Sequence, residues 1–170
     1  MNIDFDKYDC DVVEYISGFV VKSVGIHLSC NICFKFALKH ASDKHTKNNW
    51  INFKEKYCLN HPQKEIVDIC KYAEAELKTS LNFENCMKKL FFQKMTQKVV
   101  NQFTFRCPNF FDQMYLVPGH DPEHRYNLLV KLVKKYLAIR VHKFIKNHNV
   151  ETKKKSGRSL QSLFILEMNK

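Results

Sequence analysis

Turn-forming residues are scarce in this sequence of 170 residues, which holds only 4 Gly and 4 Pro against 14 Phe. Folds built from many short strands need frequent turns, so the scarcity argues against a β-sandwich or a β-barrel. A disordered chain is also excluded, because 45% of the residues are hydrophobic and can form a core. The length is typical of one domain.

No secretory signal or membrane span is recognisable in the sequence. The first residues include Asp4, Asp6 and Asp9, whereas a signal peptide begins with positive charge. The longest apolar stretch near the start, residues 15–26, contains Lys22 and is about half as long as a membrane span. The seven Cys, an odd number, therefore predict reduced thiols in a cytoplasmic or nuclear protein.

Sequence motifs of catalysis are missing as well. The chain has no nucleophile elbow, no Gly-rich phosphate loop, no His-Glu-x-x-His pair and no set of carboxylates for two-metal chemistry. Gly119, His120 and Asp121 resemble a short metal-binding pattern, but Asp121 before Pro122 is better explained as the cap of the next helix. We therefore predict no catalytic residue and no enzyme activity for this chain.

Apolar residues recur at helical spacing along nearly the whole chain. The pattern predicts an all-α fold, an irregular multi-helix bundle with a long basic C-terminal helix and a short amphipathic tail. The predicted helices cover residues 11–26, 28–40, 62–79, 83–105 and 123 to about 148. Residues 1–148 form the predicted domain, and residues 149–170 hold a Lys-rich hinge (149–157) and the tail.

Positive charge is concentrated in one segment. Of the 28 Lys and Arg, 11 lie within residues 125–158 beside a single acid, whereas the whole chain has a net charge of +11. The lysines of the last helix lie opposite its apolar arc, so they face solvent on a rigid rod. Such a face can bind phosphates through counterion release; the alternative is a solvated face with no ligand. The predicted phosphate contacts are Lys131, Lys134, Lys135, Lys146, Lys153, Lys154 and Lys155.

Arg140 departs from this pattern because it lies near the middle of the apolar arc. A buried cation must be paired, since an isolated one costs several kcal/mol or more. We predict a structural salt bridge to Glu14 or to another acid on a helix face; a phosphate-binding role is the alternative. Glu74 and Glu76 lie on the flank of a helix and are predicted to be solvated.

Cys30 and Cys33 have the spacing of a zinc-binding pair. Cys58 and His61 have similar spacing, so the two pairs could form a site of three cysteines and one histidine. The alternative is that the two thiols begin a helix and are buried as small hydrophobic groups, as the neighbouring Phe residues suggest. Zinc at Cys30 and Cys33 is therefore a hypothesis, and no other cofactor is predicted.

Three segments together resemble the C-terminal region of P-element-type transposases, the group that includes THAP-domain transposase-like proteins. They are residues 14–21 (EYISGFVV) with the Cys pair that follows, residues 50–70 with their WINFKEK start, and residues 134–142 (KKYLAIRVH). The sequence departs from the family pattern at residues 56–58, where Lys-Tyr-Cys replaces the usual Arg-Gly-Gly. Cys58 and His61 thus fall where the family does not typically have ligands, which weakens the four-ligand hypothesis.

The resemblance implies a domain that follows a zinc-coordinating DNA-binding domain and an RNase H-like catalytic core interrupted by a GTP-binding insertion. The catalytic acids would then lie upstream of this chain, in a truncated or domesticated element. The implied function is a non-catalytic accessory domain in the nucleus that contacts DNA phosphates through its basic helix. The alternative is a protein-interaction module, whose apolar tail (residues 160–166) docks on the catalytic domain or on a second copy.

Overall fold

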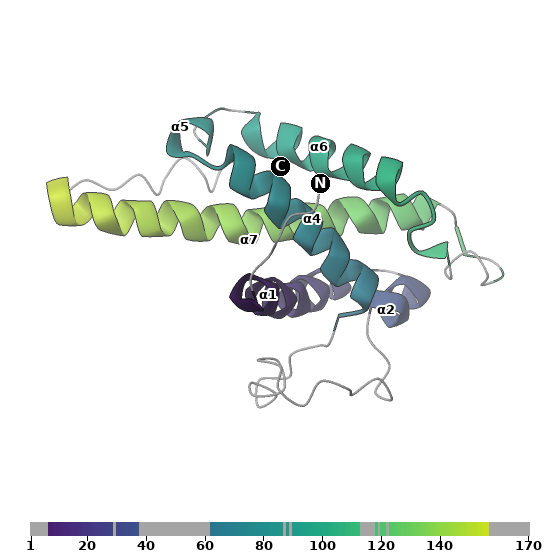
Figure 1. Ribbon diagram of the computed structural model, residues 1–170. Helices are drawn as coiled ribbons and strands as arrows, with labels where there is room; N and C mark the ends of the chain where they lie inside the picture. The colour runs from purple at the N-terminus through teal and green to yellow at the C-terminus, as the bar shows by residue number, and fades with distance from the viewer. Residues whose placement is uncertain are drawn as a thin grey trace, which may run out of the picture.

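The computed structural model describes residues 7–28, 30–37, 62–86, 88, 90–112, 118, 120, 121 and 123–156. Over these residues the secondary structure is helical, without a β-strand, which confirms the predicted all-α class. The helices, drawn in Figure 1, are α1 (Lys7–Gly25), α2 (Asn31–Ala37), α4 (Lys64–Ser80), α5 (Phe83–Cys86), α6 (Phe91–Arg106) and α7 (Glu123–Ser156).

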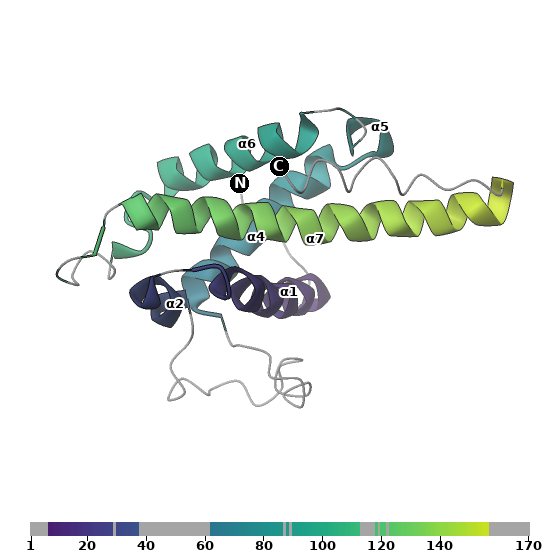
Figure 2. The same cartoon turned by 180° about the vertical axis from the view of Figure 1, so that it is seen from behind.

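Helix α7 is the element around which the others pack. Helices α1, α4 and α6 all contact α7, and α4 also contacts α1 and α6. Figures 1 and 2 show α4 crossing α7, with α1 and α6 on either side of the crossing. The C-terminal end of α7 extends past these three helices, so its last turns have fewer neighbours than its middle.

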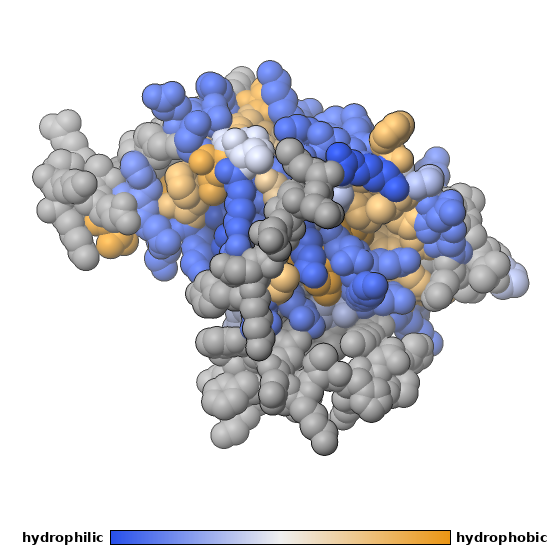
Figure 3. Space-filling model, viewed as in Figure 1, coloured by the Kyte–Doolittle hydropathy of each residue, from blue (hydrophilic) through white to orange (hydrophobic). Residues whose placement is uncertain are grey.

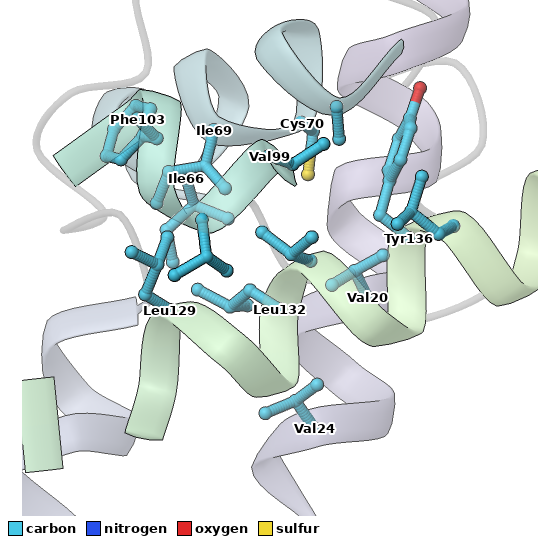
Figure 4. Packing of buried hydrophobic residues seen from close by; sticks show 14 of the residues in the cluster. Val20, Val24, Ile66, Ile69, Cys70, Val99, Phe103, Leu129, Leu132 and Tyr136 are labelled. Carbon is cyan, nitrogen blue, oxygen red and sulfur yellow. The ribbon is translucent and has the colours of Figure 1, made fainter. Parts of the chain in front are cut away.

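The core forms where α1, α4, α6 and α7 meet. Figure 4 shows Leu129 and Leu132 of α7 among apolar side chains of α4 and α6, with Val20 of α1 nearby. Both leucines are fully buried, as is Val99 of α6. Burying a side chain of this size stabilises a fold by about 1.5–3 kcal/mol. The helical spacing of apolar residues therefore identified the faces that pack together.

Several helix boundaries differ from the predictions, and α1 already begins at Lys7 instead of residue 11. The single helix predicted at residues 83–105 is divided into α5 and α6, and Asn82 Oδ1 accepts a hydrogen bond from the N–H of Asn85 at the start of α5 (2.7 Å). Helix α4 begins at Lys64, just after the predicted start at Pro62. The hinge predicted from residue 149 is wrong as far as Ser156, because α7 continues through these residues. No Pro or Gly interrupts them, and polar residues alone do not end a helix.

A buried ion pair joins α4 and α7 in the core. Arg140 donates hydrogen bonds to both carboxylate oxygens of Glu74, at 2.8 Å from Nε and 2.5 Å from Nη2. The hydroxyl of Tyr136 donates a third, to Glu74 Oε2 at 2.9 Å. The predicted pairing of Arg140 is confirmed, but its partner is Glu74, not Glu14. The prediction that Glu74 is solvated is wrong, because the residue is only 2% exposed.

This network shifts the pKa values of its members. Burial alone would lower the pKa of Arg140, but the hydrogen bonds and the charge of Glu74 more than offset burial and raise it. Burial raises the pKa of Tyr136, and the negative charge of Glu74 raises it further. The carboxylate therefore sits between a permanent cation and a hydroxyl that stays protonated.

The described residues on the face shown in Figure 3 are mostly hydrophilic. On the face shown in Figure 3, hydrophobic residues form several separate patches among hydrophilic ones. The described helices contain no segment with the length and apolar character needed to span a bilayer. The tail at residues 158–168 lies outside the described residues, and the division of the chain at residue 148 remains a prediction.

Candidate metal centre and basic helix face

Two cysteines and two histidines meet where α2 and α7 begin. Cys30 directly precedes α2, and Cys33 lies in its first turn. His120 comes just before α7, and His124 is the second residue of that helix. One potential ligand atom from each residue lies within 4.8 Å of the other three. Segments far apart in sequence thus supply two sulfurs and two nitrogens to one location.

The contacts inside this group, the Cys–His cluster, are close. Cys33 Sγ lies 3.2 Å from His120 Nε2, and the two imidazole rings meet edge to face with their centroids 5.1 Å apart. Cys33 is buried, and the other three side chains are partly buried. Nδ1 of His124 is buried and has no hydrogen-bond partner among the described residues. The cluster is therefore compact and shielded, with at least one polar atom unsatisfied.

The two thiols of the cluster differ in acidity. A hydrogen bond from the backbone of Cys33 lowers the pKa of Cys30 to about 6, and a side-chain hydrogen bond with His124 contributes, while burial partly opposes them. Burial raises the pKa of Cys33 to about 12, and the neighbouring Cys30 adds to this shift. One thiolate therefore forms readily, and its charge makes a second one costly.

The described start of the connector between α6 and α7, residues 107–112, makes aromatic and cationic contacts with both α2 and α7. Phe111 is fully buried and has a positive φ of 57°, which a bulky residue adopts only where its surroundings require it. The centroid of its ring lies 5.3 Å from the centroid of the Phe36 ring in α2, and the two rings meet edge to face. The guanidinium of Arg125 lies 4.0 Å from the centroid of Phe110 and donates to the carbonyl of Pro108. These contacts hold the connector against both α2 and α7.

Asp121 caps α7 as the sequence predicts, because its Oδ1 accepts a hydrogen bond from the backbone N–H of Glu123 at 2.8 Å. Its second carboxylate oxygen lies 4.0 Å from Nε2 of His124. Asp121 therefore caps the start of α7 and also lies beside the imidazole of His124, a member of the Cys–His cluster.

Replacing Asp121 with Ala should lower the free energy of unfolding by about 1 kcal/mol, as the loss of an N-cap typically does. The Asn variant keeps an oxygen that can accept the same hydrogen bond, so it should lose much less. Urea denaturation followed by circular dichroism measures both values. Equal losses for Ala and Asn would show that the cap does not contribute as described.

Sequence reasoning missed the two histidines of the cluster. It explained His120 as part of a turn and did not consider His124 as a partner of the Cys pair. The predicted cap is confirmed, and the residues around it also bring both rings to Cys30 and Cys33. Cys58 and His61, the partners first considered for this pair, lie outside the described residues.

The predicted cationic face of α7 is present on the surface. Lys131, Lys134 and Lys146 are exposed, and Lys135 is partly buried. The structure adds Lys143, which is also exposed. We call the set of five lysines the basic face: Lys131, Lys134, Lys135, Lys143 and Lys146. Within the described part of the chain, none of them forms an ion pair with a carboxylate.

Lys153, Lys154 and Lys155 belong to the last two turns of α7, but their side chains lie outside the described residues. Their helical backbone replaces the predicted hinge and places them on the same rod as the basic face. Lys131 also connects the two candidate sites, because its positive charge favours the thiolate of Cys33. One helix therefore carries both the cations and part of the Cys–His cluster.

A comparison with protein families identifies a relationship over most of the chain. Residues 4–146 match the family model described as DNA transposase THAP9, C-terminal domain. The matched region contains the Cys–His cluster and the whole basic face. No curated protein and no solved structure matches the chain.

Proposed function

The chain belongs to the family of DNA transposase THAP9 C-terminal domains, and on this premise we propose that it binds the phosphate backbone of DNA through the basic face of α7. Five lysines stand on one rigid helix without a carboxylate partner among the described residues. This arrangement is the observation that carries the proposal. Each phosphate contact would release condensed counterions and so favour binding.

Lysine rather than arginine dominates the basic face, which bears on specificity. A lysine ammonium contacts phosphate as a point charge, whereas base reading in the major groove favours the two-pronged guanidinium of arginine. We therefore expect binding with little sequence preference. Such a domain would position DNA for a catalytic domain located elsewhere and would work in the nucleus.

An accessory rather than catalytic role fits the side chains that the structure brings together. Cleavage of phosphodiesters by two metal ions uses carboxylates to hold the metals. Over the described residues, the one group of potential metal ligands consists of cysteines and histidines and contains no carboxylate. The proposal accordingly assigns DNA contact, not strand cleavage, to this chain.

Reversing three charges of the basic face should weaken DNA binding strongly. We expect the triple variant Lys131→Glu, Lys134→Glu, Lys135→Glu to bind a duplex roughly tenfold to a hundredfold less tightly at low salt. The slope of log K against log salt should fall by about 2–3, since each lost phosphate contact removes about 0.9 from it. Fluorescence anisotropy over a salt series, with two duplexes of unrelated sequence, gives both quantities.

The matched control reverses three exposed lysines on three other helices, Lys22, Lys64 and Lys94. Its net charge changes by the same amount, so it should bind nearly as the native chain does if position on α7 decides the affinity. Equal weakening in both variants would overturn the proposal, because total charge alone would then explain binding. Unchanged binding in the α7 variant would favour the alternative, a module that docks on the catalytic domain or a second copy.

A further inference from the structure

The Cys–His cluster has the sequence spacing of a zinc site once its two halves are read together. Cys30 and Cys33 are separated by two residues, and His120 and His124 by three. Structural zinc sites typically use two to four residues between cysteines and three to five between histidines. Both pairs thus satisfy the rule, although α4, α5 and α6 lie between them in the sequence.

The distances also fit a single ion. A tetrahedron with bonds of about 2.3 Å to sulfur and about 2.0 Å to nitrogen has edges of roughly 3.3–3.8 Å. The distance of 3.2 Å between Cys33 Sγ and His120 Nε2 is close to such an edge, and every pair of ligand atoms lies within 4.8 Å. Small side-chain adjustments would bring all four atoms to bonding distance.

We propose that Cys30, Cys33, His120 and His124 bind one zinc ion as a structural site. Two sulfurs and two nitrogens in a tetrahedron are the ligand set that selects zinc among the common divalent metals. Four protein ligands leave no open position, so the ion stabilises the fold and does not activate water. Binding replaces the two thiol protons, which pass to solvent, with bonds to the metal.

Hydrogen bonding among these side chains explains the cluster less well. Cys33 contacts one nitrogen of His120, and a side-chain hydrogen bond links Cys30 with His124. Nδ1 of His124 is nevertheless buried without a partner among the described residues. A disulfide between Cys30 and Cys33 would remove the thiol groups that face both rings. A metal ion instead uses all four groups at once.

The side chain of Asp121 supports the same assignment. Zinc-binding histidines commonly hold a carboxylate near the nitrogen that does not bind the metal, and this partner orients the ring. Asp121 Oδ2 lies 4.0 Å from Nε2 of His124, on the opposite side of the imidazole from the buried Nδ1. The site therefore has an outer carboxylate as well as four inner ligands.

The position of the site indicates what it stabilises. Helix α2 has only seven residues, too few to be stable in isolation. The proposed ion joins the start of α2 to the segment in which α7 begins, and Cys33 and His120 in these two segments are 87 positions apart. It would therefore hold α2 and the connector onto the bundle. This inference does not depend on DNA binding.

The test is the zinc content of the full chain, purified without chelators from cells grown with added zinc. Mass spectrometry of the metal should find one zinc per chain in the native protein. Cys33→Ser and His124→Ala should each reduce this value at least fivefold. The matched controls Cys107→Ser and His142→Ala change exposed residues outside the cluster and should keep one zinc.

Substitution with cobalt identifies the ligands and covers variants that fold poorly. Co²⁺ added to the metal-free native chain should give the intense visible bands of a tetrahedral site and a thiolate charge-transfer band in the near ultraviolet. Cys30→Ser should roughly halve the charge-transfer intensity. Zinc below one-fifth per chain with no tetrahedral cobalt spectrum would overturn the assignment. Loss of zinc in the double variant Cys58→Ser, His61→Ala, with retention in His124→Ala, would overturn it as well.

Discussion

Replacing Glu74 with Ala should destabilise the fold by about 3–5 kcal/mol, the usual cost of removing one partner from a buried ion pair. The substitution leaves the guanidinium of Arg140 and the hydroxyl of Tyr136 without their acceptor. The lower end of the range is expected, because the Arg140 side chain is 23% exposed and can reach water. For a chain of this length the melting temperature should fall by about 6–20 °C.

The matched control is Glu76, on the same helix, whose carboxylate pairs with Lys98 at 2.6 Å. The Glu76 side chain is only 14% exposed, so the prediction that it is solvated is wrong as well, but its partner Lys98 is 47% exposed. A pair whose cation reaches solvent contributes roughly 0–1 kcal/mol. Glu76→Ala should therefore change stability little. Urea denaturation of both variants compares them directly, and Glu74→Gln, which keeps one acceptor oxygen, should fall between them. Equal stability of the two Ala variants would contradict the role assigned to Glu74.

The Glu74 network shows which part of a buried contact is predictable from sequence. Arg140 stands among apolar residues at helical spacing, so its need for a partner follows from the cost of an isolated buried charge. The partner could not be identified, because Glu74 and Glu76 look alike in sequence and only the packing of α4 on α7 places Glu74 beside Arg140. Charge balance predicts that a pair exists, and three-dimensional packing decides its members.

The fold was predictable to the level of helices and their apolar faces. Periodicity marks a face directly, and Asp121 marks the start of α7 because a cap depends on neighbouring backbone groups. The gap between α5 and α6 and the continuation of α7 through Ser156 were not predictable in the same way. At both places the local sequence is compatible with helix and with loop, and packing decides.

The Cys–His cluster could not be predicted from the sequence for a different reason. The spacing of the Cys pair indicates a zinc site, and the nearest residues in the sequence with similar spacing are Cys58 and His61. The true neighbours in space, His120 and His124, come 87 or more positions after Cys33. Only the return of α7 along α2 brings the pairs together. A paired search for both spacings at any separation, Cys-x-x-Cys with His-x-x-x-His, would have found the four residues.

Removing the metal should destabilise the chain in a localised way if the zinc site exists. A ligand that binds only the folded state at 100 to 1,000 times its dissociation constant adds about 2.7–4.1 kcal/mol of stability. A strong zinc chelator should therefore lower the melting temperature by about 5–16 °C. Readdition of zinc should restore it, and Cys33→Ser should not respond to the chelator.

Hydrogen exchange distinguishes loss of this site from general unfolding. Chelation should speed exchange first in α2 and in the first turn of α7, because the proposed ion joins these two segments. Amides in the middle of α4 and α7 should stay protected, since Ile69 and Leu132 are fully buried in the apolar core and regions of a fold can open separately. If chelation speeds amide exchange equally along the whole chain, the ion does not stabilise α2 and the start of α7 in particular. Unchanged exchange in α2 would show that packing of Phe36 and Phe111 holds this helix without metal.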